Sequence, residues 1–363
     1  MVAIDVIAFA LGATAVIGVL GSALRTVVVP RGIPARIASV VFLITRAGFR
    51  IRVGPASSYA RRDRIMAGYA PFSLLALLTT WLVIVMVGFT AMFWALEGNH
   101  LRTSFYLSGS AVFTLGFERT ADAPGIVLIL FEAAIGLLLL ALLIAYLPSI
   151  YSAFSRREVA VSGLRTLAGS PPSATGLIKR MAAIKGFTEL DEVWNRWEQW
   201  FIELEETHTS FPSLVFFRSP SPNHSWVTAA GAVLDSAALV VSALQIESGA
   251  EPQLCIRAGW LALRSVADFY GIAYDPDPNP TDPVSITQSE FAATCDQFAA
   301  AGIPLRADRE QAWRDFVGWR VNYDTVLLAL AGLVGAPEAP WSSDRATSPR
   351  IGWRHRNRLA PPP

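Results

Sequence analysis

Charge, lysine and cysteine are all scarce in this chain. Charged residues make up 16% of its 363 positions, and the formal net charge is only +1. Such a balance gives no reason to expect a nucleic-acid partner. The two cysteines, Cys255 and Cys295, lie far apart and match no zinc or redox spacing, so we expect both to be reduced and structural.

Motifs for catalysis and cofactor binding are missing as well. The sequence has no phosphate-binding loop, no nucleophile elbow and no recognisable catalytic dyad, so we expect no enzyme, no catalytic residues and no cofactor. Four possible metal ligands lie near one another in sequence: Glu203, Glu206, His208 and His224. Their spacing matches no metal motif, and we expect a solvated acidic helix end without a metal.

Hydrophobic residues are the abundant class, at 53% of the chain, and the mean hydropathy is +0.41. Three stretches reach the roughly 20 residues that a helix needs to cross a bilayer: Ala3–Val28, Pro71–Leu96 and Gly125–Leu147. The first carries Asp5 where a secretory signal would be positively charged, so we interpret it as a retained helix. The pattern predicts an all-α, multi-pass protein of the cell membrane.

The distribution of arginine predicts the orientation. Nine arginines lie at or between the first two apolar stretches: Arg25, Arg31, Arg36, Arg46, Arg50, Arg52, Arg61, Arg62 and Arg64. The connection from Glu97 to Pro124 holds only Arg102 and Arg119. Because cytoplasmic loops collect arginine and lysine, we expect the amino terminus outside and the carboxyl-terminal half in the cytoplasm. The short apolar run Ile37–Thr45 in the basic connection predicts an interfacial helix.

A distinctive segment lies between the second and third stretches. A short helix up to Val112 is expected there, followed by Thr114-Leu115-Gly116-Phe117-Glu118. This segment resembles the pore helix and selectivity filter of the potassium-channel family, whose signature is Thr-Val-Gly-Tyr-Gly. The resemblance extends from Pro71 to about Glu158 and is closest to channels with two pore-forming spans and one pore loop, a layout that also occurs in bacterial ion channel-like proteins.

The resemblance implies a homotetramer that passively conducts potassium or other monovalent cations. Backbone carbonyls and the Thr114 hydroxyl would bind the ion, and Gly116 would supply the backbone turn. Leu115 and Phe117 would pack the filter against its pore helix. Glu118 replaces the second glycine of the signature, which implies weaker selectivity. It would form either a carboxylate ring at the outer mouth or a local salt bridge with Arg119.

The third apolar stretch contains three further candidate residues. Glu132 is an acid inside a membrane helix, where charge is costly and usually functional. It could face the cavity or brace the pore helix through a hydrogen bond. Gly136 lies where a gating hinge is expected by resemblance, although packing explains a membrane glycine equally well. Pro148 predicts a kink or an end of this helix.

The carboxyl-terminal half predicts a bundle of about six helices. Apolar residues at helical spacing between Leu190 and Glu206 indicate a buried face. The apolar run Trp226–Ile246 contains Asp235, which favours a bundle helix over a fourth span. We therefore divide the chain into an amino-terminal transmembrane helix (1–30), a basic connection (31–69), a pore domain (70–155), a helical domain (156–340) and a disordered tail (341–363).

One alternative belongs to a different functional class. A membrane receptor or scaffold could retain a channel-like core without conducting ions and signal through the helical domain. Substitution of Thr114 or Gly116 would abolish flux in a channel, whereas a scaffold would keep its partner binding. In the channel interpretation, the helical domain gates the pore or holds the tetramer together.

Overall fold

The computed structural model describes residues 2–29, 35–53, 58–96, 100–185 and 187–347. The described chain is helical and contains no β-strand beyond an isolated bridge between Leu244 and Leu305. The chain divides into two compact units, Met1–Ser152 and Ala153–Pro363. Their boundary lies close to position 155, where the sequence predicts the end of the pore domain.

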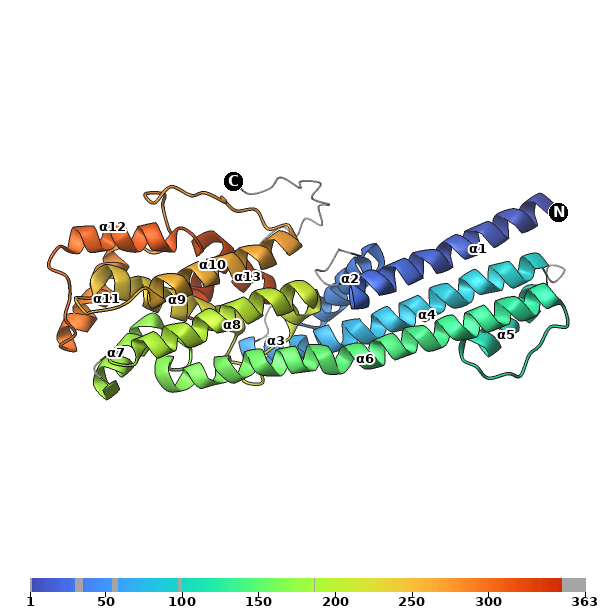
Figure 1. Ribbon diagram of the computed structural model, residues 1–363, viewed down its shortest axis with the longest axis horizontal. Helices are drawn as coiled ribbons and strands as arrows, with labels where there is room; N and C mark the ends of the chain where they lie inside the picture. Colours follow the sequence, from blue (N-terminus) through green and yellow to red (C-terminus); the bar gives the residue numbers. More distant parts are fainter. Residues whose placement is uncertain (1, 30–34, 54–57, 97–99, 186, 348–363) are drawn as a thin grey trace. The chain divides into compact units, whose positions relative to one another are not determined.

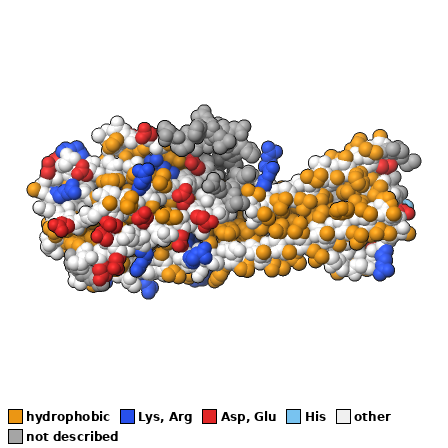
Figure 2. All heavy atoms as spheres, in the orientation of Figure 1, with side chains coloured by type: hydrophobic (Ala, Val, Ile, Leu, Met, Phe, Trp, Pro, Cys, Tyr) orange, Lys and Arg blue, Asp and Glu red, His pale blue; other side chains and the backbone are white. Residues whose placement is uncertain are grey.

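The first unit is built from long apolar helices (Figure 1). Its described elements are α1 (Val2–Ala23), the π-helical turn η1 (Leu24–Val28), α2 (Arg36–Val53), α3 (Tyr59–Ala67), α4 (Tyr69–Leu96), α5 (Leu101–Val112) and α6 (Ala123–Ala168) as far as Ser152. Figure 2 shows hydrophobic side chains covering much of the visible surface of this unit. A largely apolar exterior is expected of helices that contact lipid.

Four segments of the described chain are long and apolar enough to cross a membrane. They are Ala3–Val28, Tyr59–Leu96, Ala123–Ala168 and Trp226–Ala243. The first three contain the spans expected from the sequence. In the fourth, 94% of the most apolar window is buried inside the protein, compared with 17–39% for the others. Protein rather than lipid therefore surrounds the fourth segment.

Helix α1 packs closely along α4. A β-carbon added to Gly12 would lie 2.4 Å from the carbonyl oxygen of Gly88, and one added to Gly88 would lie 2.9 Å from the carbonyl oxygen of Gly12. The two backbones thus approach each other through glycines, as small residues allow in membrane helix pairs. Further along the pair, the Trp81 indole donates a hydrogen bond to the Ser22 hydroxyl at 3.2 Å.

The basic connection contains a longer helix than the sequence predicts. Helix α2 runs from Arg36 to Val53, whereas the expected interfacial helix covered Ile37–Thr45. One face packs on α4 through Val41 and through the hydroxyls of Thr45 and Ser73, 2.8 Å apart. The exposed side carries Val40, Ile44 and Ile51. An amphipathic helix with an exposed apolar face suits a membrane interface. Arg31 lies outside the described residues.

The second unit is a helical bundle. It contains the end of α6, followed by α7 (Ala174–Lys185), α8 (Leu190–Ser210), the 3-10 turn η2 (Pro212–Phe216), α9 (Trp226–Ala243), α10 (Glu251–Tyr270), α11 (Gln288–Ala300), α12 (Arg309–Arg320), α13 (Asp324–Val334) and the 3-10 turn η3 (Ser343–Arg345). In the described part of this unit, α7 to α13 give seven helices, where the sequence predicts about six. The expected buried face of α8 is confirmed, because Trp194, Trp197 and Phe201 are at most 3% exposed.

Helix α9 lies at the centre of this bundle and contacts α7, α10, α12 and α13. Its buried Asp235 accepts hydrogen bonds from the Arg320 guanidinium and from the Tyr323 hydroxyl. Arg320 also donates to Asp324 at 2.7 Å and to the carbonyl of Trp341 at 2.7 Å. The acid that argued against a fourth span therefore forms a buried ion pair in a protein core.

The start of the expected disordered tail packs against the bundle. The Trp341 ring lies 5.7 Å from that of Phe316. Arg345 pairs with Glu290 at 2.8 Å and donates to the carbonyl of Ser285 at 2.7 Å. Assigning residues 341–347 to a disordered tail is therefore wrong. The rest of the tail, 348–363, lies outside the described residues.

Candidate functional site

Helix α5 ends in a well-defined cap. The Leu115 amide donates to the Ser110 carbonyl at 2.8 Å, and the Thr114 amide donates to the Ala111 carbonyl at 2.9 Å. This pair of bonds is the Schellman motif, which places the residue after the cap in the left-handed region. Thr114 occupies that position with φ 53°. A left-handed conformation costs a residue with a β-carbon about 1–2 kcal/mol, so this turn stores strain.

An extended segment follows the cap. Gly116 adopts φ 71°, a value that glycine tolerates without steric cost. The backbone amide of Glu118 donates to the buried Ser110 hydroxyl at 3.2 Å, which ties the segment back onto α5. Glu118 is not among the described residues with positive φ, so its backbone carries no left-handed strain. The structure records no ion pair between Glu118 and Arg119 in the described chain.

The apolar side chains of this segment are largely uncovered within one chain. Leu115 is 63% exposed and Phe117 is 60% exposed. Phe117 contacts α5 through Tyr106, with ring centroids 6.5 Å apart, whereas the expected packing of Leu115 against α5 is not observed within the chain. The Thr114 hydroxyl donates to the preceding carbonyl of Phe113 at 2.8 Å. In the described structure, the carbonyl oxygens from Thr114 to Phe117 accept no hydrogen bond.

Behind this segment, Glu132 of α6 contacts α5. Its side chain is fully buried, and its Oε1 lies 2.5 Å from the Ser108 hydroxyl. Ser108 also lies 2.9 Å from the carbonyl oxygen of Met86 in α4. This is the contact that the bracing role of Glu132 requires.

Gly136 and Pro148 occupy different settings in α6. A β-carbon on Gly136 would lie 2.4 Å from the carbonyl oxygen of Val112, the last residue of α5, so Gly136 provides a close packing contact. Of the two alternatives considered at Pro148, a kink or a helix end, the end is excluded, because α6 continues to Ala168. Proline removes one backbone hydrogen bond, and helices in membrane proteins tolerate that loss where neighbouring groups compensate.

Sequence reasoning missed Ser108 and Ser110. Both hydroxyls are buried, and they hold Glu132 and the backbone of Glu118 respectively. The available signal is the number of serines in one short helix, where Ser104, Ser108 and Ser110 lie among apolar residues. Serine is also common in membrane helices for packing alone. Only the folded structure therefore shows that Ser108 and Ser110 form these hydrogen bonds.

A second polar group lies in the bundle, where α6 residues after the unit boundary meet α8. Buried Arg157 donates to Nε2 of His208 at 3.2 Å and to the carbonyls of Leu214 and Phe217 at 2.9 and 2.7 Å. It also pairs with Glu158 at 2.8 Å. The expected solvated position of His208 is therefore wrong. In the described chain, no three metal-ligand side chains come together.

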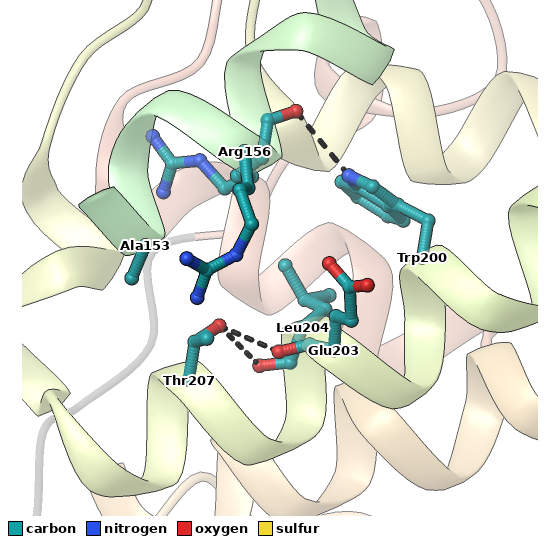
Figure 3. A pocket seen from close by; sticks show the side chains of 7 residues that line it. Ala153, Arg156, Trp200, Glu203, Leu204 and Thr207 are labelled. Carbon is teal, nitrogen blue, oxygen red and sulfur yellow. Dashed lines mark hydrogen bonds between the residues drawn. The ribbon is translucent and has the colours of Figure 1, made fainter. Parts of the chain in front are cut away.

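Figure 3 shows a small hollow beside this group, lined from α6 and α8. The Trp200 indole donates to the backbone carbonyl of Arg157 at 3.3 Å. The Thr207 hydroxyl donates to carbonyls of its own helix, at Glu203 and Leu204. The Trp200 bond fixes α6 onto α8, so the hollow belongs to a packed junction within the bundle.

The buried His208 predicts acid sensitivity. Burial and the adjacent Arg157 guanidinium hold the pKa of His208 well below its usual value in the folded state. In the unfolded chain it returns to about 6.5, so the unfolded state binds the proton more readily. The second unit should keep its full stability above that pH and lose up to about 1.4 kcal/mol for each pH unit below it. Denaturation of the full-length protein on both sides of this pH measures the loss.

His208→Gln is the matched variant, because glutamine keeps an acceptor but does not titrate. His224, the pKa of which is lowered by burial and by Arg165, remains in both proteins and cancels in the comparison. The variant should lose less stability than the wild type between neutral and acidic pH. An equal loss in both proteins would contradict the assignment of acid sensitivity to His208.

Comparison with protein-family models, with curated proteins and with solved structures finds no match to this chain.

Proposed function

We propose that the chain is one subunit of a homotetrameric cation channel, which conducts potassium or other monovalent cations through a filter formed by Thr114–Glu118. In this proposal α4 and α6 are the two pore-forming spans and α5 is the pore helix. The second unit gates the pore or holds the tetramer together, and no catalytic step is involved.

The observation that carries the proposal is the backbone of the filter segment. Its carbonyl oxygens from Thr114 to Phe117 have no hydrogen-bond donor in the described chain, although the segment follows a helix that packs against α4. Irregular backbone at membrane depth is stable only where protein buries it or where it lines a watery path. Free carbonyl oxygens on such a path can replace the hydration shell of a cation. The left-handed Thr114 adds strain of the kind that occurs at functional sites.

The exposed apolar side chains support assembly into an oligomer. Phe113, Leu115 and Phe117 are each more than half exposed on the single chain. They flank the same backbone that needs burial, so neighbouring subunits around a common axis would cover both. Each chain supplies one filter segment, and the proposed cation path is enclosed by four such segments. The proposed assembly is therefore a tetramer.

Ion flux into liposomes tests the proposal. Purified full-length protein should admit potassium down a gradient, and Gly116→Ala should reduce flux to that of empty liposomes, because alanine is strained at φ 71°. Gly18→Ala is the control, since its added β-carbon meets no atom within 4 Å and its φ is helical. Wild-type protein that is tetrameric but passes neither potassium nor sodium would favour the non-conducting receptor or scaffold.

The same assay measures selectivity. Glu118 stands where the family signature has glycine, so the wild type should admit sodium as well as potassium. Glu118→Gly restores the glycine and should raise the ratio of potassium to sodium flux. An unchanged ratio would show that Glu118 does not weaken selectivity.

A further inference from the structure

Three oxygens from three helices meet behind the filter segment. The Ser108 hydroxyl of α5 lies 2.5 Å from Oε1 of Glu132 in α6 and 2.9 Å from the carbonyl oxygen of Met86 in α4. That carbonyl also accepts from the Thr90 hydroxyl at 2.7 Å. Each distance is within hydrogen-bond range, so the three oxygens form a short chain from α6 through α5 to α4.

The number of protons limits how this chain can form. A carbonyl oxygen only accepts, and a serine hydroxyl has one proton to donate. Two full, two-centre hydrogen bonds along three oxygens need two protons, and the Glu132 carboxyl is the group that can supply the second. Were Glu132 ionised, Ser108 would donate to it, and the Ser108 oxygen would face the Met86 carbonyl without a proton between them.

The surroundings of Glu132 also oppose a charge. Helix α4 contains no charged residue, and the one charged residue of α5, Arg102, lies over the Tyr106 ring instead. No ion pair in the described chain includes Glu132, and its Oε2 has no hydrogen-bond partner. An unpaired buried carboxylate is far more costly than an unpaired carbonyl oxygen of a neutral acid.

We infer that Glu132 is a neutral carboxylic acid that donates its proton to Ser108, which in turn donates to the Met86 carbonyl. Glu132 thus holds α5 in position by donating a hydrogen bond, and it does so without a charge. The copies of Glu132 in a tetramer therefore form no cation-attracting ring in the cavity. The consequence for conduction rests on the proposed channel function: loss of the Glu132 donor would release the helix that carries the filter segment.

Infrared spectroscopy of the full-length protein in lipid tests the protonation directly and needs no ion flux. At neutral pH we expect a protonated-carboxyl band that shifts in heavy water, disappears in Glu132→Gln and persists in the control Glu118→Gln. In Ser108→Ala the band should move to higher frequency, because the carboxyl loses its acceptor. Absence of the band in the wild type, or its persistence in Glu132→Gln, would overturn the inference.

Flux measurements then test the positioning role. Glu132→Gln keeps a donor of similar size and should retain most of the wild-type flux and thermal stability. Glu132→Leu removes the donor and should lower both. Equal behaviour of the two variants would show that the donor has no positioning role. If the wild type conducts no ions but shows the band, the channel proposal fails and the protonation of Glu132 stands.

Discussion

Replacing Arg320 with methionine should lower the free energy of unfolding of the second unit by about 3–5 kcal/mol. The guanidinium is completely buried and forms ion pairs with Asp235 of α9 and Asp324 of α13. Methionine fills a similar volume but leaves two buried carboxylates without a cation. The Tyr323 hydroxyl would remain as a donor to Asp235 and cannot neutralise it. Chemical denaturation of the full-length protein, followed by tryptophan fluorescence, measures the change.

Arg314→Met is the matched control in the same helix. Arg314 is 56% exposed at its side chain and pairs with Glu310 at 3.8 Å. Exposed pairs of this kind contribute about 0–1 kcal/mol, so the control should change little. The double variant Arg320→Met with Asp235→Asn should recover part of the loss, because it removes one stranded charge. Equal destabilisation by the two methionine variants would contradict a central role for the buried network.

Long apolar stretches were the most predictable part of the fold. The spans expected at Ala3–Val28 and Pro71–Leu96 lie within segments found in the structure, because a run of that length has few other stable conformations. The burial of Trp226–Ala243 was also predictable, since Asp235 is costly in lipid, whereas a protein core can supply a paired cation, here Arg320. Orientation in the membrane and the tetramer stay predictions.

Local details were harder to predict because they depend on partners distant in sequence. The tail beginning at Trp341 has the composition of a disordered segment, yet Phe316 and Glu290 hold residues 341–347 in place. The break between α12 and α13, from Arg320 to Asp324, is one such detail, because the sequence has no glycine or proline there.

The burial of His208 could have been predicted from its helical spacing, but its acidic neighbours in sequence favoured a solvated position. It follows Leu204 by four positions and so continues the buried stripe of Trp197 and Phe201 on α8. Residues four apart share a helix face, which predicts burial. Glu203 and Glu206 lie on the exposed side of the same helix. Helical periodicity was therefore a better guide here than proximity in sequence.

Gly136→Ala should reduce ion flux to background and lower the stability of the first unit by about 1–3 kcal/mol. The added β-carbon would lie 2.4 Å from the carbonyl oxygen of Val112, so α6 and the end of α5 must separate. Val112 comes two residues before Thr114, where the proposed filter segment begins. A displacement there would move the carbonyl oxygens proposed to bind the ion. Liposome flux and thermal unfolding of the same preparation measure the two effects.

Gly163→Ala provides the control within the same helix, because its β-carbon would meet no atom within 4 Å. Alanine favours helix over glycine by up to about 1 kcal/mol, so this variant should be neutral or stabilised and should conduct normally. The pair also separates the two roles considered for Gly136. A hinge glycine would alter opening without affecting thermal stability, whereas a packing glycine must lose both together. Loss of flux at unchanged stability would therefore favour the hinge over the close contact with Val112.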